Sequence, residues 1–171
     1  RSVLQYCKRK IPLKENDTDI MLRMQAAQII ATPEALQDFI HSLNQELAFA
    51  LDTESNSLHA YYERVCLIQV STASQDFIID PLALTDLSPL APLMANKGIQ
   101  KVLHAGDYDI ACLKRDFGFE FANLFDTMLA ATTLGETNLG LAALLESRFG
   151  LRLEKKFQRA DWGKRPLMPA M

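Results

Sequence analysis

Apolar runs alternate with amphipathic segments along most of this chain, and several of the runs end abruptly at carboxylates. Runs rich in β-branched and aromatic residues predict strands at residues 29–31, 46–54, 65–71, 76–80, 99–104 and 123–126. Apolar residues three and four positions apart predict helices at residues 33–43, 88–96, 107–117, 127–134 and 139–149. The order predicts an α/β fold, a mixed sheet with three antiparallel strands followed by parallel strands and with helices on both faces.

Three of the predicted helices have clear end signals. Thr32 is expected to cap the first helix, because Pro33 follows it at the first helical position. Gly118 and Gly150 are expected to close two later helices. Asp107 is expected to cap the helix that it opens.

Length and composition fit one domain with its own core. The chain has 171 residues, of which 49% are hydrophobic and 23% charged. Residues 1–26 have weak periodicity and are interpreted as an N-terminal arm or linker, and residues 27–171 as the domain. No apolar run approaches the length of a membrane span. Cys7, Cys66 and Cys112 are odd in number and widely spaced, which fits a reducing compartment, so we expect a cytoplasmic protein.

Charge is unevenly distributed along the chain. The formal net charge of −3 excludes a protein that is basic throughout. Residues 148–165, however, contain seven basic and two acidic residues, a net charge of +5. By itself this segment is more simply a solvated polar face, but it could also contact the phosphates of a nucleic acid.

Two segments place carboxylates directly after apolar runs. Asp52 and Glu54 lie two positions apart on a predicted strand and should therefore share one face. Asp109 follows the helix start at Asp107 and could turn back toward the edge of the sheet. Carboxylates gathered at strand ends can bind Mg²⁺ or Mn²⁺ for phosphate chemistry. Asp126 ends another apolar run, and its pattern fits a structural hydrogen-bonding role and a place near the site equally well.

No other chemistry competes well in this sequence. His59, His104 and the cysteines lack the spacing of zinc ligands, and no glycine-rich phosphate loop is present. His104, on an apolar strand, is more simply a hydrogen-bonded core residue than a catalyst. Trp162 could stack on a base, but anchoring the basic segment to the core is the simpler interpretation.

The carboxylate motifs also resemble those of a known family. Leu51-Asp52-Thr53-Glu54, followed by the strand at 65–71, resembles the first exonuclease motif of ribonuclease D-like proteins. Residues 104–110, with Leu113 and residues 115–118, resemble the second motif. Residues 125–127 and 153–167 are similar to later family signatures. The resemblance covers about residues 27–171 and indicates the four-carboxylate, tyrosine-containing class of 3′–5′ exonucleases, with a ribonuclease H-like fold.

The resemblance implies a two-metal hydrolysis of terminal phosphodiesters. It implies that Asp52, Glu54 and Asp109 hold two divalent ions, either Mg²⁺ or Mn²⁺. The implied substrate is the 3′ end of a nucleic acid, most simply RNA of the tRNA-precursor type, although DNA trimming remains open. Contacts to the nucleic acid are expected from five residues: Thr53, His104, Lys155, Lys156 and Arg159. Neither a membrane nor an obligate protein partner is expected.

A third family motif, Tyr-x-x-x-Asp, is not found in these residues. Residues 166–171 resemble the lead-in to the helix that carries it, so no residue here can be assigned the water-orienting tyrosine or the last carboxylate. We therefore expect an exonuclease domain that is incomplete at its C-terminus and nearly inactive by itself. The alternatives are an RNA-binding module that does not cleave, and a protein scaffold in which the carboxylates are caps and strand ends.

Overall fold

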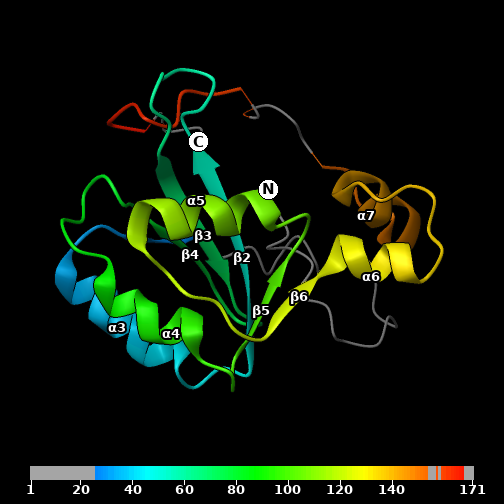
Figure 1. Ribbon diagram of the computed structural model, residues 1–171, viewed down its shortest axis with the longest axis horizontal. Coiled ribbons are helices and arrows are strands. Elements are labelled where there is room, and N and C mark those ends of the chain that lie inside the picture. Colours follow the sequence, from blue (N-terminus) through cyan, green and yellow to red (C-terminus); the bar gives the residue numbers. More distant parts are fainter. Residues whose placement is uncertain (1–25, 154–156, 158, 168–171) are drawn as a thin grey trace.

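One mixed sheet organises the fold in the computed structural model, which describes residues 26–153, 157 and 159–167 (Figure 1). Its strands are β1 (Gln28–Ile30), β2 (Ala48–Ser55), β3 (Val65–Ser71), β4 (Asp76–Ile79), β5 (Gln100–Leu103) and β6 (Leu124–Asp126). They lie in the order β1-β4-β3-β2-β5-β6. Strands β2, β3 and β4 are antiparallel neighbours, whereas β5 and β6 continue the sheet in parallel from β2. The predicted mixed sheet is therefore confirmed.

The helices follow the predicted order with small shifts at their ends. They are α3 (Pro33–Leu43), α4 (Ala91–Ala95), α5 (Asp107–Phe117), α6 (Thr127–Thr133) and α7 (Leu141–Phe149). A 3-10 turn at Ser88–Leu90 precedes α4, so the predicted helix at 88–96 forms in two short pieces, each with a proline in its first turn. The arm predicted for residues 1–26 lies, except for its last residue, outside the described residues.

The predicted helix ends at Thr32, Gly118 and Gly150 are confirmed. The Thr32 hydroxyl accepts a hydrogen bond from the Ala35 N–H at 3.3 Å. Gly118 and Gly150 take the left-handed conformation, with φ of 68° and 65°, that a residue with a side chain rarely adopts.

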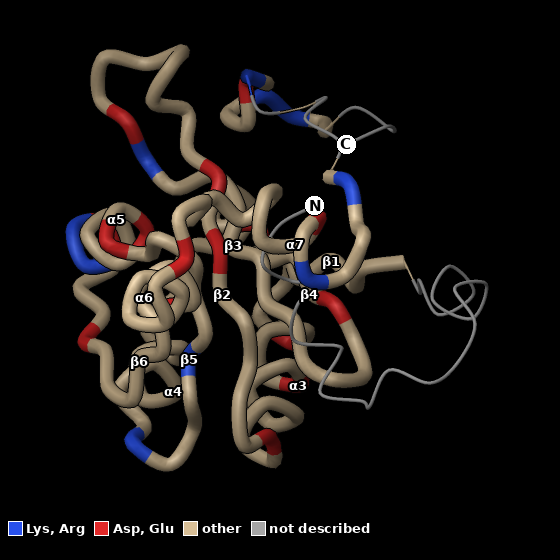
Figure 2. Tube along the Cα trace, turned by 90° about the vertical axis from the view of Figure 1, so that its right-hand side faces the viewer, with Lys and Arg blue, Asp and Glu red and all other residues tan. Residues whose placement is uncertain are grey.

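Helices lie on both faces of the sheet, as predicted, but unequally. One face carries the main core, in which Leu51 of β2 and Ile68 of β3 pack with apolar side chains of α3, α4 and α5. On the other face, Leu141 of α7 packs against the Ala50 and Val102 side chains. Figure 2 shows α5 on one side of β2 and β3, and Figure 1 shows α6 and α7 together beyond the β6 edge.

Within the described part of the chain, no helix is both long and apolar enough to cross a membrane. Cys66 and Cys112 are both buried free thiols.

Phe39 tests the packing of α3 on the sheet. Its ring is 2% exposed and meets the Phe77 ring of β4 edge-on, with centroids 4.9 Å apart. Replacing Phe39 with alanine should leave a cavity and lower the free energy of unfolding by about 3–5 kcal/mol. Urea denaturation measures the loss. As a control, Leu47→Ala, at a side chain that is 86% exposed, should change the free energy of unfolding by less than about 0.5 kcal/mol. A similar small change for Phe39→Ala would show that α3 does not need this contact.

Candidate active site

Two acidic segments converge on one backbone group. The Thr53 N–H, in β2, donates to Asp52 Oδ1 at 3.1 Å and to Asp109 Oδ1 at 3.0 Å. Asp109 lies in the first turn of α5, the helix that follows β5, the parallel neighbour of β2. The topology therefore brings two carboxylates that are 57 positions apart in the sequence within hydrogen-bonding distance of the same nitrogen. Figure 2 shows the acidic positions of β2 and α5.

Asp52 and Glu54 share one face of β2, in agreement with the sequence analysis. Across the strand pair, Asp52 lies opposite Gln69, and the Gln69 Nε2 donates to Glu54 Oε1 at 3.2 Å. Thr53, between them, points to the opposite face, where its hydroxyl donates to Asp109 Oδ1 at 2.5 Å. Asp109 therefore approaches the pair from the face that carries α5.

Burial and mutual repulsion act strongly on Asp52. Burial is the largest cause, and together with the nearby charges of Asp109 and Glu54 it raises the pKa of this carboxyl to about 7. Burial also raises the pKa of Glu54, although the hydrogen bond from Gln69 opposes the rise. The pKa of Asp109 is raised by burial too, against the two hydrogen bonds from Thr53. Three carboxyl groups thus share a region in which a full set of negative charges is unfavourable.

Their chemistry suits a hard divalent cation, but their present orientation is not that of a ligand set. Oxygen ligands with net negative charge are what Mg²⁺ and Mn²⁺ prefer. Among the described residues, however, no group of three or more His, Cys, Asp or Glu side chains is arranged to hold a metal ion. The hydrogen bonds from Thr53 are one reason why the carboxylates do not form a ligand set, because they hold one Asp109 oxygen on the α5 side of the strand.

Asp126, which the sequence left open, has a structural role. Its Oδ2 accepts from the Gly106 N–H at 2.8 Å, and its Oδ1 accepts from Ala105 at 3.2 Å, just before α5. The same carboxylate caps α6 through the N–H groups of Met128 and Leu129. Burial alone would raise the pKa of Asp126, but these four hydrogen bonds outweigh it and lower the pKa.

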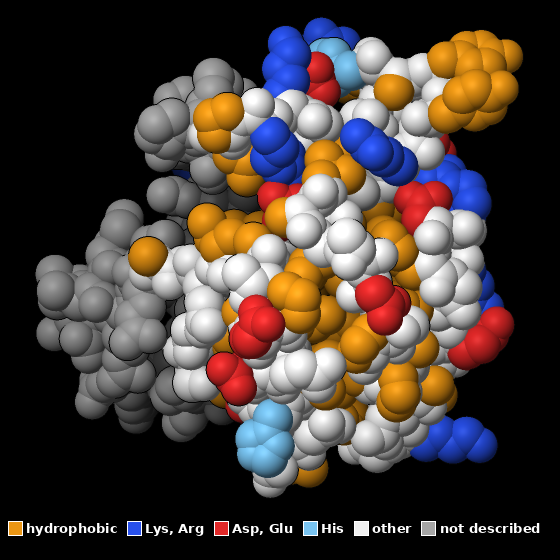
Figure 3. Space-filling view, turned by 90° about the vertical axis from the view of Figure 1, so that its left-hand side faces the viewer, with side chains coloured by type: hydrophobic (Ala, Val, Ile, Leu, Met, Phe, Trp, Pro, Cys, Tyr) orange, Lys and Arg blue, Asp and Glu red, His pale blue; other side chains and the backbone are white. Residues whose placement is uncertain are grey.

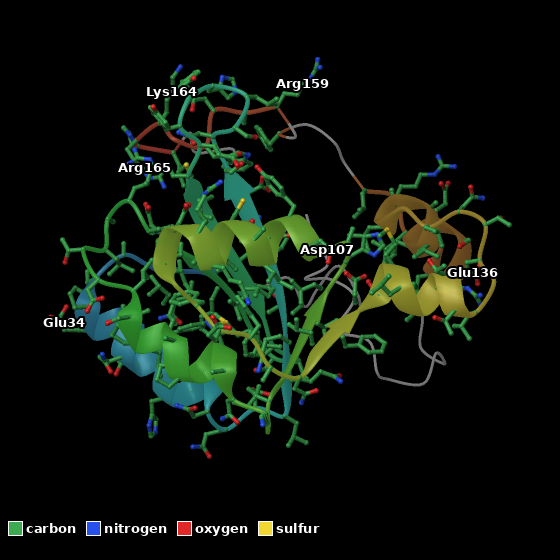
Figure 4. The ribbon with its side chains drawn as sticks, viewed as in Figure 1. Glu34, Asp107, Glu136, Arg159, Lys164 and Arg165 are labelled. Atoms are coloured by element: carbon green, nitrogen blue, oxygen red, sulfur yellow. The ribbon has the colours of Figure 1, made fainter. Side chains whose placement is uncertain are left out.

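The expectation that Asp107 caps α5 is wrong. Gly106 occupies the cap position, and no side chain caps the helix there. The helical hydrogen bonds begin one residue earlier than expected, because the Ile110 N–H donates to the Gly106 carbonyl at 2.9 Å, and Asp126 holds the backbone N–H groups of Ala105 and Gly106 from the neighbouring strand. Asp107 is the first residue of the helix and lies at the end of α5 that faces α6 (Figure 4).

His104 is a half-buried, hydrogen-bonded residue, in agreement with the simpler interpretation of the sequence. Its Nδ1 lies 2.9 Å from the Thr127 hydroxyl, which donates to the Leu103 carbonyl at 3.0 Å. Burial lowers the pKa of His104, although the Asp126 charge opposes the shift, and this favours the neutral ring. Contacts of His104 and Thr53 with a nucleic acid stay predictions.

The basic segment is largely neutralised where the structure describes it. Lys155 and Lys156 lie outside the described residues. Four other basic side chains of the segment pair with carboxylates: Arg148 with Glu136, Arg152 with Glu146, Lys164 with Asp161 and Arg165 with Asp80. Arg159 is exposed and has no carboxylate partner within the described ranges. Figure 4 shows Arg159 and Lys164 at the upper edge, above β2 and β3.

Comparisons with known proteins point to one family. The family model described as 3′–5′ exonuclease matches residues 27–171. The protein RRP6-like 3 of Arabidopsis thaliana is 39% identical over 83% of this chain and 16% of its own length. The exosome complex exonuclease RRP6 of Saccharomyces cerevisiae is 36% identical over 83% of this chain and 20% of its own length. The crystal structure of Escherichia coli RNase D, an exoribonuclease involved in structured RNA processing, superposes with a TM-score of 0.79 at 34% identity, over 85% of this chain and 39% of that one.

This chain belongs to the 3′–5′ exonuclease family. The relatives are of the RRP6 and ribonuclease D type, which confirms the resemblance seen in the motifs and the ribonuclease H-like fold. The chain spans a fifth or less of the two curated relatives and two fifths of the RNase D chain.

Two residues that support the exonuclease motifs were not assigned these roles from the sequence. Gln69 interrupts the apolar run at 65–70, and this interruption could have indicated a role beside Glu54. Arg165 binds Asp80 through both carboxylate oxygens, each at 2.7 Å, and also donates to the carbonyls of Cys66 and Trp162. A bidentate pair between segments 85 positions apart has no local sequence signal.

Trp162 anchors the C-terminal segment to the core, as expected. Its side chain is 9% exposed and packs with Cys66 and Leu67 of β3. The Arg165 hydrogen bonds to Asp80 and to the Trp162 carbonyl fix the same segment from its other side. Together these contacts place the exposed Arg159 beside the β2–β3 loop, where the Arg159 carbonyl lies 3.1 Å from His59 Nε2.

The protonation of Asp52 should make stability depend on pH. Because the folded-state pKa is about 7, above the unfolded value, the folded protein binds more protons between about pH 4 and pH 7. Its free energy of unfolding, measured in EDTA, should therefore fall as the pH rises through that window. In Asp52→Asn, the decrease in the free energy of unfolding across this pH window should be smaller by on the order of 2 kcal/mol. The exposed Asp38→Asn is the control, and parallel curves for wild type and Asp52→Asn would place Asp52 in an ordinary environment.

Arg165 should hold the C-terminal segment against the sheet. Lysine cannot reproduce its bidentate contact with Asp80, so Arg165→Lys should loosen the segment and shift the emission of Trp162, the only tryptophan, toward longer wavelength. Lys164→Ala, at an 81% exposed side chain, should leave the spectrum unchanged. An identical spectrum for Arg165→Lys would show that packing of Trp162 alone holds the segment.

Proposed function

We propose that the protein is a 3′–5′ exonuclease that removes nucleotides from RNA 3′ ends, and that Asp52, Glu54 and Asp109 bind its divalent metal ions. Membership of the exonuclease family supports the reaction class. The observation that carries the proposal for the site is the raised pKa of Asp52, caused by burial beside two further carboxylates. A cation would relieve the repulsion that this arrangement creates.

The proposed ions are Mg²⁺ or Mn²⁺, two per site. When bound, such a pair supplies a lowered pKa for the attacking water and charge stabilisation for the phosphate and the leaving 3′-oxygen. The three carboxylates would provide the charge and the oxygen ligands. Asp109 would have to turn from the Thr53 hydroxyl to contribute both of its oxygens.

Other residues of the chain orient these carboxylates. Gln69 donates to Glu54 and fixes one of its oxygens. The Thr53 N–H holds Asp52 and Asp109 close together before any ion binds. Asp126 binds the backbone just before α5 and so sets where the first turn, with Asp109, begins.

RNA is the proposed substrate because the relatives point to it. The E. coli relative is described as an exoribonuclease, and a Trypanosoma brucei RNase D of the same fold is described in complex with the RNA U12. We propose that phosphates of the strand are bound by Lys155, Lys156 and Arg159, with Thr53 and His104 close to the terminal nucleotide. A cytoplasmic location remains a prediction from cysteine usage.

Replacing Asp52 with asparagine should abolish cleavage in the full-length protein. The change removes a metal-binding charge at nearly constant shape, so the rate of release of 3′ nucleotides should fall on the order of 1000-fold or more. The affinity for a single-stranded RNA should stay within about threefold, because the substitution leaves the basic side chains intact. Glu34→Gln on α3, far from β2 in Figure 4, is the control and should cleave like the wild type.

The same experiment separates the alternative function. Retained cleavage by Asp52→Asn would remove this residue from the site. Wild-type protein that binds RNA but does not cleave it with either Mg²⁺ or Mn²⁺ would instead favour an RNA-binding module on the same fold. The observation that favours this RNA-binding function is the orientation of Asp109, whose carboxylate faces Thr53 and not the other two carboxylates.

A further inference from the structure

Two tyrosines stand almost fully in solvent on the loop that leaves the acidic strand. Tyr61 is 94% exposed and Tyr62 is 85% exposed, and their rings meet edge-on with centroids 4.9 Å apart. Leu58, in the same loop, is 68% exposed. A cluster of large apolar side chains at a loop tip contributes nothing to the core and is typical of a binding surface.

The loop that carries them is ordered by its own hydrogen bonds. Asn56 closes its base, because the Asn56 N–H donates to the Arg64 carbonyl at 3.3 Å and the Arg64 N–H donates to Asn56 Oδ1 at 2.9 Å. The N–H groups of His59 and Ala60 donate to the Asn56 carbonyl at 2.8 and 3.0 Å. The tyrosines are therefore held out on a preformed turn, which lowers the entropy cost of binding.

Contacts with α5 place this loop next to the proposed active site. Glu63, which follows Tyr62, accepts hydrogen bonds from the Tyr108 hydroxyl and from Arg115 Nη1, the second at 2.6 Å. Tyr108 directly precedes Asp109 in the first turn of α5. The exposed rings are thus tied, through Glu63, to the residue beside a proposed metal-binding carboxylate.

Positive charge lies on the same side of the molecule. Arg64 is exposed at the end of the loop, and Arg159 is exposed where its backbone meets His59. Figure 3 shows basic side chains along the upper edge of the face that it views, and Figure 1 shows the β2–β3 loop beside the C-terminal segment at that edge. Aromatic rings beside basic side chains bind single-stranded nucleic acid by stacking on its bases and pairing with its phosphates.

We propose that Tyr61 and Tyr62 form a stacking surface for unpaired bases of the RNA strand whose 3′ end enters the active site. This inference rests on the proposed function and adds a requirement for a single-stranded segment upstream of the scissile bond. The rings would hold bases regardless of their identity, because every base presents a π-face. Arg64 and Arg159 would pair with the phosphates between those bases.

Binding to two oligonucleotides tests the surface without any cleavage. The probes are a 12-nucleotide oligoadenylate and an abasic strand of equal length, both fluorescein-labelled and measured by anisotropy in EDTA. Tyr61→Ala/Tyr62→Ala should bind oligoadenylate about 10- to 100-fold more weakly than the wild type and the abasic strand equally well. Tyr61→Phe/Tyr62→Phe keeps both rings and should bind both probes like the wild type.

Leu47→Ala removes an equally exposed side chain beyond the other end of β2 and serves as the position control. Unchanged Trp162 emission shows that the alanine variant is folded. Wild-type affinity of the alanine variant for oligoadenylate would overturn the inference, as would an equal loss on both probes. If self-association of the wild type were lost in that variant while RNA affinity was kept, the tyrosines would belong to a protein contact instead.

These binding data, taken together with the cleavage assay of the proposed function, keep the two proposals apart. Wild-type protein that binds neither probe would contradict the proposed function itself. Wild-type protein that binds and cleaves RNA, with an alanine variant of equal affinity, would contradict only the stacking surface.

Discussion

The repulsion among partly buried carboxylates is the constraint on which the site depends. Asp52 and Asp109 meet at a single backbone N–H of Thr53, and Glu54 adds a third acidic group on the same strand. In a region of low dielectric such a group is stable only if protons, hydrogen bonds or cations offset its charge. The structure uses the first two, since the pKa of Asp52 is raised to about 7 and Thr53 and Gln69 donate to its neighbours.

The surrounding fold serves to bring these groups together and hold them. The central strand β2 carries two carboxylates, and the parallel neighbour β5 delivers α5 to the same end of the sheet. Asp126 joins the start of α5 to the start of α6 through four backbone hydrogen bonds. This single side chain caps α6 and also holds the backbone that leads into α5, whereas Asp107 is exposed.

The edge of the molecule above β2 combines three segments that are distant in sequence. The β2–β3 loop presents Tyr61 and Tyr62, α5 holds that loop through Tyr108 and Arg115, and the C-terminal segment is fixed by Arg165 and Trp162. The β2–β3 loop contacts α5 through Glu63 and the C-terminal segment through His59, so this edge has a defined shape next to the carboxylates. Such a preformed surface fits a strand that must be held while its end reaches the site.

The order of strands and helices can be predicted from the sequence, because hydrophobic periodicity and end signals such as Thr32, Gly118 and Gly150 are local properties. The three proposed carboxylates can be identified in the same way, since apolar runs that end in acidic residues are visible without a structure. The groups that offset each charge are known only from the folded chain: the Thr53 contact with Asp109, the Asp126 bonds before α5 and the Asp80–Arg165 pair. These contacts depend on strand order and join residues that are dozens of positions apart, so the local sequence pattern does not predict them.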